Sequence, residues 1–191
     1  LVHPAKNGTN RKTKYSTVMV DYGGQLISLV SALPNKFVKE GLDKNQLPMF
    51  DGYSLVRPEI PVGRHRFDFL LKDPKKSDFY LEVKSVTFVK DGVAQFPDAA
   101  TERGAKHAIA LKKLVERGKG AGILFVCQRP DATLFRPMWE RDPKLAQSVL
   151  DAKKQGLFKK HSFKSLLAIK SGMRELQEAL NELEEKNVIM F

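Results

Sequence analysis

The sequence predicts a mixed α/β fold in which a central sheet is flanked by helices. Three observations lead to this fold class: β-branched and aromatic runs at residues 65–71 and 79–88, a helix-spaced apolar stripe within residues 99–117, and an apolar run at residues 122–127. The apolar run has the length of a strand and no polar position, as expected of a strand buried on both faces. The order strand, strand, helix, strand is typical of a mixed sheet that helices cover on both sides.

The N-terminal part is predicted to hold a loop, a hairpin and a short helix. Residues 1–14 are polar and basic, and are expected to be a loop or the end of a preceding unit. Residues 15–20 and 25–30 are β-rich runs separated by four turn-forming residues, a spacing typical of a hairpin. Residues 34–42 begin with a proline and hold a glycine near their end, which predicts a helix.

The later helices are predicted from apolar spacing and from residues that start or stop a helix. Residues 99–117 carry apolar side chains at helical spacing and are followed by two glycines. A second helix is expected over residues 143–155, with Asp142 as its N-cap. Beyond it, residues 161–169 are expected to form a strand and residues 173–185 a last helix.

The chain is strongly basic. It carries 33 Lys and Arg against 22 Asp and Glu in 191 residues, a formal charge of +11. Such an excess favours a polyanionic partner, because neutralising phosphates releases counterions. The alternative is a solvated basic surface that only aids solubility. Charge alone does not separate a nucleic acid from an acidic lipid or an acidic protein.

Composition argues against two classes of protein. The longest apolar run, residues 121–127, is far shorter than the roughly 18–20 residues that cross a bilayer. A single cysteine, Cys127, excludes a disulfide framework and a zinc site with several cysteines. A reducing, cytoplasmic setting without a membrane partner is therefore expected.

Three residues on two predicted strands carry the chemistry: Asp68, Glu82 and Lys84. Side chains on a strand alternate between its faces, so Glu82 and Lys84 share one face. If the strand of Asp68 pairs with that of Glu82, two carboxylates and a lysine converge on one patch of an apolar sheet. The alternative is an exposed sheet face, where Glu82 and Lys84 form a surface ion pair that contributes little stability.

The predicted cluster suits a hard divalent cation, Mg²⁺ or Mn²⁺. The carboxylates of Asp68 and Glu82 and the main-chain carbonyl of Val83 are oxygen ligands of the kind that Mg²⁺ takes, and they leave positions open for water and phosphate. A metal there would lower the pKa of bound water and stabilise phosphoryl charge. Lys84 would orient the attacking water or compensate the charge of the transition state.

The surrounding sequence resembles the D…ExK signature of the PD-(D/E)XK nuclease superfamily. The block RFDFLL at residues 66–71 is followed by YLEVKSVT at residues 80–87. A third block, FPDAATERGAKH at residues 96–107, is similar to one that is typical of the sugar fermentation stimulation protein family within that superfamily. The similarity runs from about residue 10 to about residue 170.

This resemblance implies a domain organisation and a function. Residues 31–191 are expected to form a restriction-endonuclease-like, PD-(D/E)XK domain, and residues 1–30 the C-terminal remnant of a truncated OB-like barrel. The family is described as DNA-binding and, by its fold, as nuclease-like. Asp68, Glu82 and Lys84 are then the expected catalytic residues, and Asp68, Glu82 and Val83 the expected metal ligands.

Residues around the third block are expected to contact nucleic acid. Thr101 can cap a helix whose first N–H groups attract phosphate. Basic side chains recur at helical spacing opposite the apolar stripe and are expected to form a ridge beside the metal patch: Arg103, Lys106, Lys113 and Arg117. Glu102 is either a third carboxylate or a favourable first-turn anion. His107 is expected to be a packed or exposed helix residue rather than a metal ligand.

The sequence predicts a metal-dependent phosphodiesterase that acts on DNA, with duplex DNA as the expected partner. One alternative is a non-catalytic DNA-binding or regulatory protein that uses the same cleft. A third hypothesis is an enzyme directed at RNA or at a small phosphate. The intact D…ExK pattern favours the first, because two carboxylates facing a polyanion repel it unless a cation lies between them.

Overall fold

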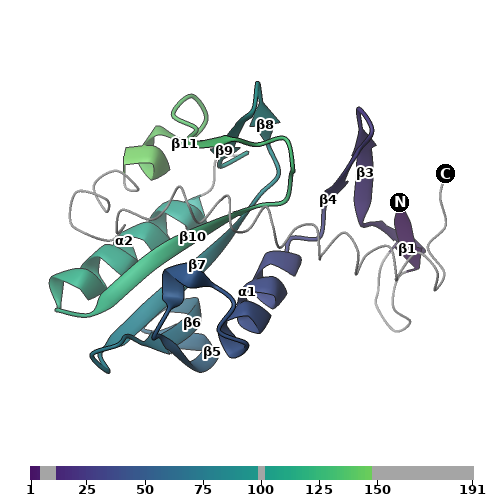
Figure 1. The fold of residues 1–191 in the computed structure, drawn as a ribbon. Helices are drawn as coiled ribbons and strands as arrows, with labels where there is room; N and C mark the ends of the chain where they lie inside the picture. Colours follow the sequence, from purple (N-terminus) through teal and green to yellow (C-terminus); the bar gives the residue numbers. More distant parts are fainter. Residues whose placement is uncertain (5–11, 99–101, 148–191) are drawn as a thin grey trace.

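The structure, a computed structural model of the 191-residue chain, describes residues 1–4, 12–98 and 102–147. A four-stranded sheet forms its centre, with the strand order β10-β7-β6-β5 (Figure 1). Strand β10 runs parallel to β7, while β6 is antiparallel to both β7 and β5. These strands are β5 (Ser54–Val62), β6 (His65–Lys72), β7 (Asp78–Val86) and β10 (Gly120–Cys127). The prediction of a mixed α/β fold is confirmed.

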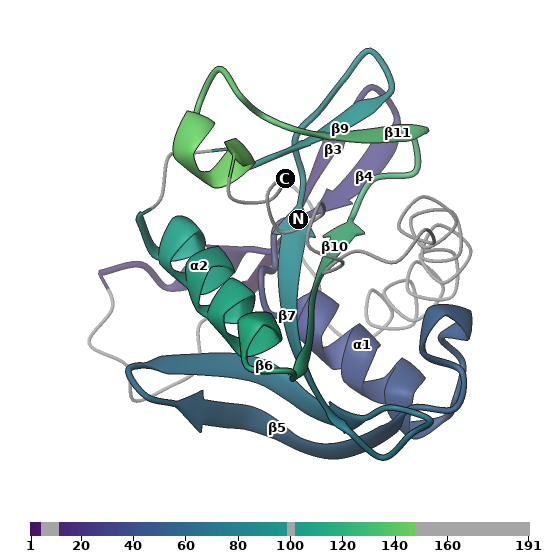
Figure 2. The same ribbon diagram turned by 90° about the vertical axis from the view of Figure 1, so that its left-hand side faces the viewer.

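Two helices cover opposite faces of this sheet: α1 (Leu33–Asp43) and α2 (Glu102–Glu116) (Figure 2). Alternation along β7 decides which side chains meet which helix. Leu81 and Val83 pack in one cluster with Val38 and Leu42 of α1. On the other face, Tyr80 packs against a cluster that contains Leu111 and Leu114 of α2. Each helix therefore presents its apolar side to the sheet, and the helix predicted at 34–42 is confirmed.

Strands β6 and β7 separate at Asp68, and we call this point of separation the fork. The pairing of β6 with β7 ends at Phe69 and Leu81, whereas β6 still pairs with β5 as far as His65. Phe69 packs on the α1 side, but Phe67 packs on the α2 side, although residues two apart on a regular strand share a face. The chain of β6 is therefore twisted at the fork.

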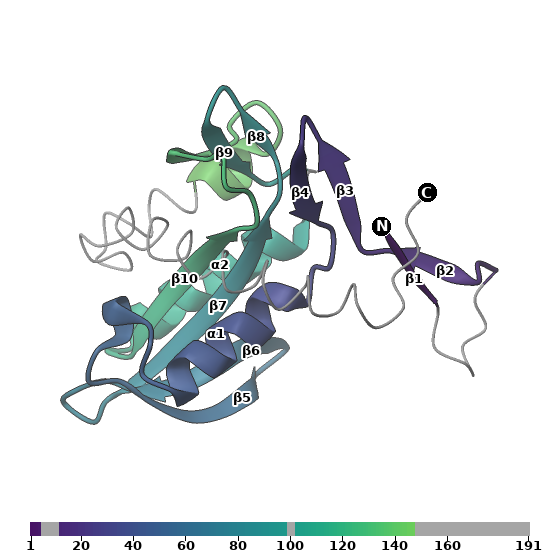
Figure 3. The same ribbon diagram turned by 45° about the vertical axis from the view of Figure 1, so that its right-hand side comes forward.

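Smaller sheets complete the described chain. They are a three-stranded sheet of order β11-β9-β8 and two separate strand pairs, β1-β2 and β3-β4. The strands are β1 (Val2–Pro4), β2 (Tyr15–Thr17), β3 (Met19–Tyr22), β4 (Gln25–Ser28), β8 (Val89–Lys90), β9 (Val93–Phe96) and β11 (Leu134–Pro137). Figure 3 shows β1–β4 to one side of the four-stranded sheet.

The N-terminal predictions need two corrections. The hairpin is confirmed only for β3 and β4, which turn at Gly23 and Gly24 with φ of 63° and 79°. Positive φ is strained for residues with a Cβ, which explains the glycines. Strand β2 pairs instead with β1, so residues 2–4 are a strand rather than a loop.

The short 3-10 helix η1 (Pro48–Phe50) lies in the connector between α1 and β5. After β11, the chain turns helical beyond Asp142, whose Oδ1 accepts a hydrogen bond from the Leu145 N–H at 2.9 Å. This contact confirms the predicted N-cap. The predicted strand at 161–169 and helix at 173–185 lie outside the described residues. Within the described ranges, no helix is long and apolar enough to cross a bilayer.

Candidate functional site

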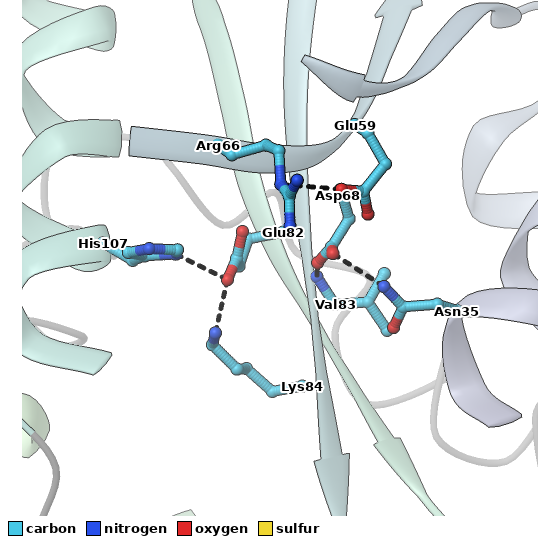
Figure 4. Close-up of polar contacts among 8 residues, drawn as sticks. All are labelled: Asn35, Glu59, Arg66, Asp68, Glu82, Val83, Lys84 and His107. Atoms are coloured by element: carbon cyan, nitrogen blue, oxygen red, sulfur yellow. Dashed lines mark hydrogen bonds and ion pairs between the residues drawn. The ribbon is translucent and has the colours of Figure 1, made fainter. Parts of the chain in front are cut away.

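Glu82 is a buried carboxylate on the face of β7 that α2 covers. Its exposed fraction is 3%. Oε1 accepts a hydrogen bond from Lys84 Nζ and lies 2.7 Å from His107 Nδ1 (Figure 4). The predicted sharing of one face by Glu82 and Lys84 is confirmed. The alternative of an exposed surface ion pair is wrong, because Lys84 is only 19% exposed.

His107 reaches Glu82 from α2. Its ring is held between aromatic neighbours, with the centroid 5.8 Å from that of Phe67 and 5.5 Å from that of His65, both edge to face. These contacts fix the ring so that Nδ1 faces the Glu82 carboxylate. The prediction of a packed helix residue is confirmed, but the contact with Glu82 was not predicted.

The second carboxylate oxygen of Glu82 has no hydrogen-bond partner in the part of the chain that the structure describes. Oε2 is buried and accepts no hydrogen bond from any described residue. A buried charged oxygen without a donor costs free energy, so native proteins supply a donor or a cation at such a position. The arrangement around Glu82 is therefore incomplete at Oε2.

Asp68 lies at the fork and points toward α1. Its Oδ1 accepts a hydrogen bond from Asn35 Nδ2 at 2.6 Å, and its Oδ2 accepts one from the Val83 N–H at 2.7 Å (Figure 4). Because β6 leaves β7 there, the Val83 N–H lacks a ladder partner on β6, and the carboxylate takes that place. Asn35 is a second contact that sequence reasoning missed.

The expected convergence of Asp68, Glu82 and Lys84 is therefore correct for two of the three residues and wrong for Asp68. The carboxylate of Glu82 points to α2 and that of Asp68 to α1, from adjacent stretches of backbone (Figure 4). The twist of β6 at the fork is the physical reason, since the prediction assumed a regular ladder through residue 68.

The two carboxylates nevertheless act on each other electrostatically. Burial raises the pKa of Asp68 above its ordinary value, and the negative charge of Glu82 raises this pKa further. The hydrogen bonds from Val83 and Asn35 and the charge of Lys84 lower the pKa, but they only partly offset the rise. An additional cation near both carboxylates would relieve this repulsion.

The predicted basic ridge is present in part. Lys106 and Lys113 are exposed on α2, and Arg117 is exposed directly after its end. Thr101 lies outside the described residues, and Arg103 and Glu102 belong to α2 without a described side chain. Arg66 lies near Asp68 and pairs through Nε with Glu59 at 2.7 Å, an exposed ion pair that was not predicted (Figure 4).

The fold and the site define a mixed α/β protein with a buried glutamate, lysine and histidine cluster beside a strand fork. A family model described as "Sugar fermentation stimulation protein RE domain" matches residues 32–163. The chain belongs to the sugar fermentation stimulation protein family, as its resemblance predicted.

Relatives and a solved structure agree with this assignment. The chain is 40% identical over 152 residues to a sugar fermentation stimulation protein homolog of Clostridium botulinum, covering 80% of this chain and 66% of that protein. A homolog from Clostridium kluyveri is 41% identical over 148 residues, covering 78% and 64%. The chain thus spans just under two thirds of these relatives' lengths.

The structure of Pyrococcus furiosus SfsA in complex with Ca²⁺ is similar, with a TM-score of 0.72 and 29% sequence identity. The match covers 81% of this chain and 65% of that one.

Proposed function

We propose that this chain carries a metal-dependent phosphodiesterase site that acts on DNA. The site is built on a restriction-endonuclease-like sheet within residues 31–191. The observation that carries the proposal is the buried Glu82 Oε2, which lacks a donor while Asp68 nearby has a raised pKa. This pattern of perturbed, underpaired carboxylates is typical of functional sites.

The residues present fit a hard divalent cation. Within the described residues, no three His, Cys, Asp or Glu side chains are grouped to hold a metal. Mg²⁺ is usually held by one or two carboxylates and several waters. Glu82 Oε2 is the oxygen available to Mg²⁺ or Mn²⁺, and Asp68 and the Val83 carbonyl would complete the set once the Asp68 side chain turns from Asn35 toward the ion. Such an ion, when bound, acidifies water and stabilises phosphoryl charge.

The other side chains of the cluster position and balance Glu82. His107 and Lys84 both contact Oε1, which leaves Oε2 as the oxygen available to a new ligand. Lys84 places a positive charge beside the site, where it can stabilise negative charge on a phosphate or orient a water. The ring packing of His107 keeps the Glu82 carboxylate in one orientation.

Two findings on related proteins support the proposal. The solved structure of Pyrococcus furiosus SfsA is described as a complex with Ca²⁺, a cation that takes oxygen ligands. The matching family model is named for an RE domain. The first finding supports a hard-cation site, and the second supports the proposed type of sheet.

The test is nicking of supercoiled plasmid with Mg²⁺ or Mn²⁺ by the wild type and by a Glu82→Gln variant. Glu82→Gln keeps the shape of the side chain and removes its charge, so we expect nicking to fall at least about a hundredfold. Glu40→Gln, on the exposed side of α1, is the matched control and should leave the rate unchanged. Equal nicking by the wild type and Glu82→Gln would reveal a contaminating nuclease.

The second candidate is a DNA-binding protein without nuclease activity. The observation that favours it is that both oxygens of Asp68 are already bonded, to Asn35 and Val83. A protein of this kind would shift DNA in a gel but would nick no plasmid with any divalent metal. We propose the phosphodiesterase first, because two neighbouring carboxylates weaken binding to a polyanion unless a cation accompanies them.

A further inference from the structure

A groove of about 1120 Å³ lies between the β5–β6 turn and α2. Its cationic lining comes from both walls: Arg64, Arg66, Lys106, Lys113 and Arg117. Within the described chain no acidic side chain lines it. The groove is therefore positively charged from two sides, and the wall that the β5–β6 turn supplies was not predicted from the sequence.

The cations of α2 and Arg117, the residue directly after it, form one stripe along the helix. At about 100° per residue, Lys106, Lys113 and Arg117 lie within about 40° of one another around the axis. They span about 16 Å along it, close to the axial length of five nucleotides of one strand in B-form DNA. Ala110 lies between them on the same side and also lines the groove, so a small side chain leaves room in the middle of the stripe.

Three of the five lining cations form no ion pair with a described residue. Lys112 pairs with Glu116 at 3.9 Å, and neither residue lines the groove. Within the described residues, Arg64, Lys113 and Arg117 form no ion pair, whereas Arg66 is shared with Glu59. At least three guanidinium or ammonium groups are thus available to an anionic ligand.

The groove meets the Glu82 cluster at His107. That residue lines the groove and also contacts Glu82 Oε1 through Nδ1. Exposed apolar surface accompanies the charges, since Ile109 is 46% exposed and lines the same groove. Cations spaced along a groove beside apolar surface match a sugar–phosphate backbone, in which charged phosphates alternate with sugars.

We propose that this groove binds the sugar–phosphate backbone of one polynucleotide strand between Arg64 of the β5–β6 turn and the Lys113–Arg117 side of α2. The strand then passes His107 on its way to the Glu82 cluster. This inference rests on the proposed function and adds the path of the substrate to it. Phosphate contacts of this kind position the chain without reading its sequence.

The test measures binding of fluorescently labelled 20-mers by anisotropy in EDTA at several salt concentrations. Three probes of the same sequence are compared: duplex DNA, single-stranded DNA and single-stranded RNA. For Lys113→Ala/Arg117→Ala, we expect affinity to fall about tenfold or more and the slope of log K against log salt to shrink by about 2. Arg64→Ala should shrink that slope by about 1.

The matched control removes two charges at the other end of β6. Lys75→Gln/Lys76→Asn changes two exposed lysines in the β6–β7 turn, and Asn suits residue 76 because its φ is 64°. This variant should keep the wild-type affinity and slope. All four proteins should have the same circular dichroism spectrum, because the changed side chains are exposed.

Each outcome decides between the alternatives. Weakened binding by the groove variants but not by the control supports the groove, and the three probes then show whether DNA or RNA supplies the backbone. Unchanged binding by the groove variants, with plasmid nicking by the wild type, overturns the groove and leaves the proposed function intact. A wild type that binds no polynucleotide and nicks no plasmid overturns both.

Discussion

The two ends of the β6–β7 ladder each carry an aspartate, and the two aspartates lie in opposite electrostatic environments. At the closed end, Asp78 is in register with Lys72 and bonds Lys119 Nζ at 2.8 Å and Lys72 Nζ at 2.7 Å. The hydrogen bond from Lys119 and then that from Lys72 lower the pKa of Asp78. At the open end, the fork, burial and the charge of Glu82 raise the pKa of Asp68.

The difference separates an aspartate whose charge two lysines compensate from an aspartate whose charge is only partly compensated. Asp78 lies in the last pair of the β6–β7 ladder, and Lys72 and Lys119 compensate its negative charge. The ionised form of Asp78 therefore favours the folded state. Asp68 replaces a missing ladder partner of Val83 and lies close to a second carboxylate, so its charge is costly. Functional sites commonly hold such costly groups because a ligand completes them.

The largest expected effect is a difference in nicking activity between variants of the two aspartates. Asp68→Asn should reduce metal-dependent plasmid nicking at least about a hundredfold, since an amide is a poor ligand for a divalent cation. Asp78→Asn, the matched change at the closed end, should leave nicking within about twofold. Initial nicking rates with Mn²⁺ measure both, and equal losses in the two variants would mean that Asp68 has no special role.

The next effect is on stability and concerns the partner of Glu82. His107→Ala should lower the free energy of unfolding by about 2–4 kcal/mol, because it removes a donor from a buried carboxylate and ring contacts with Phe67. His107→Gln should recover part of the loss. Urea unfolding gives these values.

His65→Ala is the control for the ring contacts alone. His65 stacks on Phe67 with a centroid distance of 6.2 Å and lies edge to face with His107. His65→Ala should therefore lower the free energy of unfolding clearly less than His107→Ala does. If the two losses are equal, the contact with Glu82 adds nothing to stability.

A smaller effect of opposite sign is expected for the stability of Asp68→Asn in EDTA. The pKa of Asp68 is raised above 3.8 in the folded protein, so its ionised form destabilises the fold at neutral pH. The amide keeps an acceptor for the Val83 N–H without the charge. Asp68→Asn should exceed the wild type in stability above pH 6, by at most about 1 kcal/mol.

The pH dependence of stability shows whether the charge of Asp68 stabilises or destabilises the fold. Wild type and Asp68→Asn should converge as the pH falls below 3.8, where Asp68 becomes protonated in both the folded and the unfolded state. The variant's advantage should grow as the pH rises through the raised pKa and then level off. Melting temperatures from pH 4 to 8 measure it, and a variant less stable than the wild type at pH 7 would contradict the balance of contacts described for Asp68.

The smallest effect is at the closed end. Asp78→Asn should destabilise the protein by less than about 1 kcal/mol, because solvent screens its lysine partners, which are 39% and 46% exposed. The pKa of Asp78 is lowered, so the loss should be present above pH 4 and vanish as the pH falls through the folded pKa. Added salt at 0.5 M should reduce the loss, and a salt-independent loss would argue against the ion pairs as its cause.

Strands with regular alternation or an apolar run were predictable, and irregular ones were not. Strands β6, β7 and β10 were predicted almost to their ends, because alternation and apolar runs are local signals. Strand β5 was missed because Pro58 and Pro61 interrupt it and Glu59 takes a φ of 54°. The short strands β8, β9 and β11 hold two to four residues each, too few for a periodic signal.

In the candidate site, contacts between neighbours along one strand were predictable, and contacts between distant elements were not. The pairing of Glu82 with Lys84 followed from alternation over two residues. The contacts of Asn35 with Asp68 and of His107 with Glu82 join residues 33 and 25 positions apart, on helices whose orientation no local pattern gives.

The sequence alone determined the positive charge, the α/β order and the common face of Glu82 and Lys84, because each depends only on composition or on neighbours along one strand. Only the tertiary structure decided that Asp68 faces α1, that His107 holds Glu82 and that Arg64 forms the second wall of a groove. Those outcomes depend on where β6 leaves β7 and which N–H group is then left for a carboxylate to satisfy.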